Sequence, residues 1–231
     1  MKKNKMLRIA SVLLVAVMMS TCAISGTFAK YVTSGDAEDS ARVAKWGVTI
    51  ETSSDLFDEV YARTSTEDKH KTITNTVVVD TAGTNLVAPG TTKSINFSIS
   101  GSPEVAVEVN FAFTATSDVK IPEGTTVATG VTLDKDYTPV VFTLKKNGTV
   151  LETGTLSDIA TKFNSLSAVY GPNSTALAGS YTLTWVWDFE GANTINAADT
   201  YLGNVAAGTK TDANTNTVID FDFTITVTQI D

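Results

Sequence analysis

A regular alternation of apolar with polar or small residues, clearest from Val105 to Phe113, most limits what this chain can fold into. Successive side chains of a β-strand point to opposite faces, so a period of two predicts a strand with one buried face. The same period recurs in three further segments: residues 95–99, 181–189 and 219–227. Long strands that each have one wet face are typical of antiparallel sheets.

Turn signals separate these segments. Pro89-Gly90 precedes the strand predicted at 95–99, and Gly101-Ser102-Pro103 follows it. Asn147-Gly148 lies between apolar runs at 140–144 and 150–151, and this pair tolerates the positive φ angles of a tight hairpin turn. Weaker strands are predicted at 42–50 and 73–79.

Two segments have helical rather than strand spacing. Ile159, Phe163 and Leu166 fall at helical intervals within residues 157–169, with Ser157 as the predicted N-cap and Gly171-Pro172 as the stop. A second short helix is predicted at 197–205. The fold class is therefore all-β: an antiparallel two-sheet sandwich with one or two short inserted helices, forming a single domain over residues 41–231.

The N-terminus has the features of an export signal. A basic stretch (Lys2, Lys3, Lys5, Arg8) precedes a mostly apolar run at 9–24 and the small residues that end at Ala29. We expect a signal peptide at 1–29, cleavage between Ala29 and Lys30, and a secreted, extracellular product. Two alternatives are lipidation at Cys22, whose preceding Thr21 is a poor match to a lipobox, and an uncleaved membrane anchor.

Composition excludes several functional classes. Hydrophobic residues make up 42% of the chain and charged residues 18%, which suits a folded domain rather than a disordered tail. Removing the four leader cations from 17 leaves 13 against 25 acidic residues, a net charge of −12. Nucleic acid and anionic membranes would repel such a chain, so neither is an expected partner.

Candidate chemistry is sparse. His70 is the only histidine and there is no HExxH motif, so we predict no catalytic residues, no cofactor and no zinc site. Asp188 and Glu190 are the least poor pair for two-carboxylate catalysis, although strand alternation turns both toward solvent. Asp212, Asn214 and Asn216 are a weak calcium candidate, more simply explained as a polar turn. Trp185 and Trp187 are a candidate platform for sugars, more simply explained as core.

The order of several short motifs resembles the TasA/camelysin family of secreted Gram-positive proteins. These motifs are Gly26-Thr27-Phe28-Ala29 followed by Lys30-Tyr31-Val32, the segment at 41–48, Leu86-Val87-Ala88-Pro89-Gly90, Trp185-Val186-Trp187, the segment at 199–204, and the terminal strand at 220–229. The resemblance covers the whole chain, and no single motif is diagnostic.

The resemblance implies a jelly-roll-like subunit of biofilm-matrix fibres, released by a dedicated signal peptidase. Such subunits polymerise head to tail, and here the donated strand would be residues 30–40, with Lys30, Tyr31, Val32 and Thr33 as the polymerisation strand. An accessory anchoring or nucleating matrix protein is a further expected partner. The alternatives are a secreted adhesin or carbohydrate-binding module and, less favoured because HExxH is absent, a camelysin-type metalloprotease.

Overall fold

The computed structural model describes residues 42–52, 55–62, 72–78, 85–189 and 191–230. The chain divides into two units, residues 1–43 and 44–231, and all the strands and helices below belong to the second. None of the described helices is long and apolar enough to cross a membrane.

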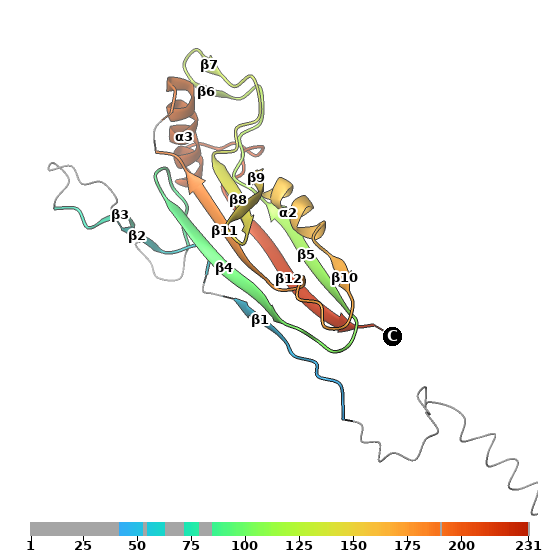
Figure 1. Cartoon of the computed structure of the whole chain (residues 1–231). Coiled ribbons are helices and arrows are strands. Elements are labelled where there is room, and N and C mark those ends of the chain that lie inside the picture. Colours follow the sequence, from blue (N-terminus) through green and yellow to red (C-terminus); the bar gives the residue numbers. More distant parts are fainter. Residues whose placement is uncertain (1–41, 53–54, 63–71, 79–84, 190, 231) are drawn as a thin grey trace, which may run out of the picture. The chain divides into compact units, whose positions relative to one another are not determined.

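Two antiparallel sheets form the sandwich (Figure 1). The first has five strands in the order β1 (Val48–Thr52), β4 (Thr92–Gly101), β11 (Gly179–Trp187), β8 (Val140–Lys146) and β9 (Thr149–Gly154). The second has three strands in the order β10 (Ala168–Tyr170), β5 (Val107–Ser117) and β12 (Asp220–Gln229). The all-β, antiparallel two-sheet sandwich predicted from the alternation is therefore confirmed.

Two short hairpins and two helices complete the domain. The hairpins pair β2 (Val60–Ala62) with β3 (Asn75–Val78) and β6 (Thr126–Ala128) with β7 (Val131–Thr132). The helices are α2 (Leu156–Asn164) and α3 (Asn193–Ala206). Both helices are insertions between strands, as expected.

Aromatic side chains fill the space between the sheets. Phe97 of β4 stacks on Tyr181 of β11 with ring centroids 5.0 Å apart, and it meets Phe223 of the second sheet at 5.6 Å. Phe111 of β5 contacts Tyr181 at 5.5 Å. The alternating apolar residues of four strands thus form one core.

Several predicted boundaries are wrong. Helix α2 begins at Leu156 with Thr155 as N-cap, because Thr155 and Asp158 form a reciprocal capping box that the predicted cap, Ser157, cannot make. The helix ends at Asn164, and part of the sequence predicted as helix forms β10. Other differences are that β1 starts at Val48, β11 stops at Trp187, and α3 starts at Asn193.

The predicted Asn147-Gly148 hairpin is confirmed. Asn147 has a φ of 50° and Gly148 a φ of 80°, and the flanking Lys146 and Thr149 are paired across β8 and β9. Positive φ at both central positions is what a tight hairpin turn requires, which explains the residue types found there.

Candidate functional site

One side of the sandwich is closed by α2. Its buried residues Leu156, Ile159 and Phe163 join the core, and the Phe163 ring packs at 5.2 Å from Phe111 and 5.8 Å from Phe97. A helix that contacts rings from both sheets prevents a further strand from entering on this side (Figure 1).

Side chains also hydrogen-bond to the backbone of β5 where this strand extends past its short partner β10. Ser167 Oγ accepts a hydrogen bond from the Phe111 amide at 2.9 Å. Asn164 accepts from the Phe113 amide at 2.7 Å and donates to the Phe113 carbonyl at 3.1 Å. The side-chain amide of Asn164 thus replaces a neighbouring strand, so this edge is satisfied.

The opposite side of the sandwich is open. There β1 and β12 end their respective sheets, and no described strand pairs with the outer edge of either. The inward-facing residues Val107 to Phe113 of β5 are at most 4% exposed, whereas those of β12 are all only half-buried: Phe221, Phe223, Ile225 and Val227. Ile50 pairs with buried Ile99 and yet is 37% exposed. The core therefore reaches solvent between β1 and β12.

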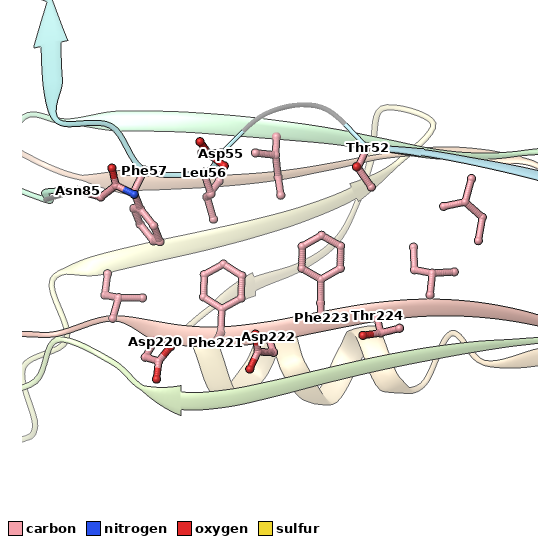
Figure 2. Close-up of a pocket in the computed structure, with 14 residues that line it drawn as sticks. Thr52, Asp55, Leu56, Phe57, Asn85, Asp220, Phe221, Asp222, Phe223 and Thr224 are labelled. Carbon is pink, nitrogen blue, oxygen red and sulfur yellow. The ribbon is translucent and has the colours of Figure 1, made fainter. Parts of the chain in front are cut away.

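A cavity of about 680 Å³ occupies this gap. We call it the edge groove. Its floor is apolar, with Ile95 from β4 and Phe221 and Phe223 from β12. Figure 2 shows both phenylalanine rings pointing into the groove, while Asp220, Asp222 and Thr224 point to the other face of β12. Alternation along β12 thus places apolar groups inside and carboxylates on the rim.

Residues 55–57 close one end of the edge groove. The Leu56 carbonyl accepts a hydrogen bond from Trp185 Nε1 at 2.8 Å, and Leu56 is buried. The Phe57 ring lies 5.6 Å from Trp185 and 6.1 Å from Phe221, so it connects the two sheets. This segment bridges the two sheets near Phe221.

The free edge of β12 offers backbone hydrogen bonds along the groove. Phe111 and Phe113 of β5 direct their backbone groups toward Ser167 and Asn164, and therefore away from β12. In an antiparallel pair, opposite residues either bond to each other or both point their backbone groups away from the pair. Ile225 and Phe223, the partners of Phe111 and Phe113, therefore direct their N–H and C=O groups to the open side. A strand lying there would gain main-chain hydrogen bonds.

The rim of the groove is acidic at the end near Phe57. Asp55, Asp220 and Asp222 line it, and an adjoining hollow of about 340 Å³ adds Asp58 and Glu59. Asp58 forms an ion pair with Lys93, with 2.6 Å between Oδ1 and Nζ. Among the described residues, neither hollow is lined by a lysine or arginine.

Two half-buried carboxyl groups lie away from the groove. Asp199 accepts hydrogen bonds from the Tyr137 hydroxyl at 2.7 Å and from Trp187 Nε1 at 3.1 Å, and burial raises its pKa. Burial also raises the pKa of Asp118, whose Oδ2 accepts from the Leu156 amide. Asp199 joins α3 to β11, and Asp118 joins β5 to α2, so both are structural.

Trp185 and Trp187 belong to the core, as the simpler explanation predicts, and do not form a platform for sugars. Trp185 is fully buried and Trp187 is 6% exposed, because both lie on the inner face of β11. Asp188 is exposed just after the end of β11, and its predicted partner Glu190 lies outside the described residues.

The side-chain oxygens of the calcium candidate have hydrogen-bond partners. Asp212 accepts from the Tyr201 hydroxyl, from Thr215 Oγ1 and from the Asn214 amide, and these bonds lower its pKa to about 2. Asn216 donates to the Asp118 carbonyl and accepts from the Val218 amide. The described residues contain no group of three or more histidine, cysteine, aspartate or glutamate side chains placed to hold a metal.

The remaining predicted sites lie outside the described residues. They are the cleavage pair Ala29 and Lys30, the rest of the polymerisation strand (Tyr31, Val32, Thr33), and also Cys22 and His70. Sequence reasoning missed the edge groove itself. The alternation in β12 identifies its inner residues but does not reveal which strands lack a neighbour.

Comparisons with protein-family models and with curated proteins each find no match for this chain.

Proposed function

We propose that this chain is a secreted structural subunit of extracellular matrix fibres. Each subunit polymerises head to tail by placing its mature N-terminal segment, residues 30–40, in the edge groove of the next. The observation that carries the proposal is that the open edge of β12 lies beside an uncovered apolar floor. The sequence resemblance to the TasA/camelysin family supports the same function.

An inserted strand would satisfy two needs of this surface. It would pair with the free backbone groups of β12, and it would cover Phe221, Phe223 and Ile225, which are half-buried. In residues 30–40, Tyr31 and Val32 are the only large apolar side chains, and strand alternation turns one of the two toward the floor. A contact between the start of one subunit and the edge of another does not close on itself, so it propagates into a filament.

Signal cleavage would control assembly. The donated segment directly follows the predicted cut between Ala29 and Lys30, so it remains tethered in the precursor. We expect the dedicated signal peptidase to release it, and fibres formed by the uncleaved precursor would contradict this control. An accessory matrix protein would nucleate or anchor the fibres.

Negative-stain electron microscopy over a concentration series tests the proposal. The mature chain, residues 30–231, should form fibres, whereas a chain starting at Ala41 should stay monomeric because it lacks the donated strand. Monomers from both chains would contradict a polymer subunit. Fibres from both would place the donated strand elsewhere.

A further inference from the structure

The two ends of the edge groove differ in charge. Asp55, Asp220 and Asp222 lie at the end closed by Phe57. Toward the other end, the outward residues of β12 are the neutral Thr226 and Thr228, and the nearest acidic side chain on the neighbouring strand is Glu108, paired with Thr228. A strand lying along β12 would therefore meet more negative charge at one end than at the other.

The segment proposed to occupy the groove has its own charge asymmetry. Cleavage before Lys30 leaves an α-ammonium group beside the Lys30 ammonium group. The far half of the same segment carries Asp36, Glu38 and Asp39. One end of the segment is thus cationic and the other anionic.

Strand alternation sets which of these charges can meet. If Tyr31 points into the apolar floor, all even-numbered residues of the segment point outward, including Lys30, Asp36 and Glu38. Asp220 and Asp222 point outward from β12 on the same face (Figure 2). Cross-strand neighbours on one face lie about 5 Å apart, where opposite charges attract and like charges repel.

We propose that the groove accepts residues 30–40 of a second copy in one direction only, parallel to β12, with Lys30 beside Asp220 or Asp222. This inference rests on the proposed function. In the parallel direction Asp36 falls beside Thr226 or Thr228. In the antiparallel direction with Lys30 beside Thr228, Asp36 and Glu38 fall beside Asp222 and Asp220, which places two pairs of like charges in contact. Charge thus overrides the slightly weaker hydrogen bonding of a parallel pair.

A photocrosslinker at position 31 tests the direction. Tyr31 is replaced by benzoylphenylalanine in the mature chain, ¹⁵N-labelled and unlabelled subunits are mixed, and fibres are irradiated. Digestion at aspartate releases residues 222–230 as one peptide, and fragment-ion mass spectrometry then assigns a cross-link within it to Phe223 or to Val227. We expect cross-links between subunits to Leu56, Phe57, Phe221 or Phe223. The same probe at Ala37, which points inward like Tyr31, should reach the Val227 end.

Each other outcome has a defined meaning. Cross-links from position 31 to Ile50 or Val227 would overturn the direction while leaving the fibre function intact. Cross-links only within one chain would overturn the second copy as occupant. Fibres without any cross-link to the groove would overturn the docking site, and an unsubstituted mature chain that forms no fibres would overturn the proposed function itself.

A charge exchange tests the cause of the direction. Asp220→Asn with Asp222→Asn should raise the critical concentration for assembly about two- to fivefold, the effect expected of a cross-strand charge pair. Asp134→Asn is the matched control, because Asp134 is exposed and does not line the groove. Lys30→Asp should impair assembly, and adding Asp222→Lys should restore it. Equal critical concentrations for the double variant and the control would overturn the charge argument.

Discussion

Asp118 shows how one carboxyl group makes stability depend on pH. Its Oδ1 atom is buried and has no hydrogen-bond partner among the described residues, and burial raises the pKa of the group above 3.8. The folded state then binds a proton more tightly than the unfolded state. The free energy of unfolding therefore falls as pH rises from about 4 through the raised folded pKa.

We expect Asp118→Asn to be more stable than the wild type at pH 7. Asparagine keeps an oxygen for the Leu156 amide but carries no charge, so the cost of burying the carboxylate disappears. Below about pH 4 both side chains are neutral, and the difference should shrink. Urea unfolding of both proteins between pH 3 and pH 8 measures it. A difference that stays constant with pH would contradict this account.

Gly101 is a position where a side chain is excluded. Its φ is +118°, and an added Cβ would lie 1.8 Å from the Gly47 carbonyl oxygen, where β1 meets β4. We expect Gly101→Ala to lower the free energy of unfolding by about 2–3 kcal/mol. Gly124→Ala is the control, because Gly124 also has positive φ but nothing within 4 Å, so it should cost only about 1 kcal/mol. Equal losses would show that the contact with Gly47 is unimportant.

At the scale of elements, α2 serves as the closure of one sheet edge. Asn164→Ala should lower the free energy of unfolding by about 2–3 kcal/mol, because the Phe113 amide and carbonyl both lose their partner. Ser157→Ala in the same helix is the control. Ser157 is exposed and does not cap the helix, so this change should stay within about 0.5 kcal/mol. Denaturant titration compares them, and similar losses would argue against α2 as the edge closure.

The elements also show what the sequence alone can predict. Long strands such as β5 and β12 follow from the period of two, and the β8–β9 turn follows from Asn147-Gly148. Strands of two to four residues, such as β7 and β10, are too short to display a period. The start of α2 was misplaced because Thr155 and Ser157 are both capping residue types, and only the position of Asp158 selects between them.

The candidate site is less predictable than the elements around it. The edge groove depends on β1 and β12 each lacking a second neighbour, and these strands are far apart in sequence. Residue type predicts that Phe221 and Phe223 face inward, but not that they remain half-buried. Exposure here is a property of strand order in two sheets, which local patterns do not encode.

For the whole molecule, the proposed assembly links stability to concentration. A strand from a second subunit binds only the folded groove, so it stabilises the folded state by mass action. At 100 times the dissociation constant the gain is about 2.7 kcal/mol, which raises Tm by about 5–10 °C for a domain of this size. We expect the Tm of the mature chain to rise with protein concentration, and the Tm of the chain starting at Ala41 to stay constant. Differential scanning calorimetry from micromolar to hundreds of micromolar subunit measures both. A constant Tm for the mature chain would mean that its first eleven residues add nothing to the fold of another copy.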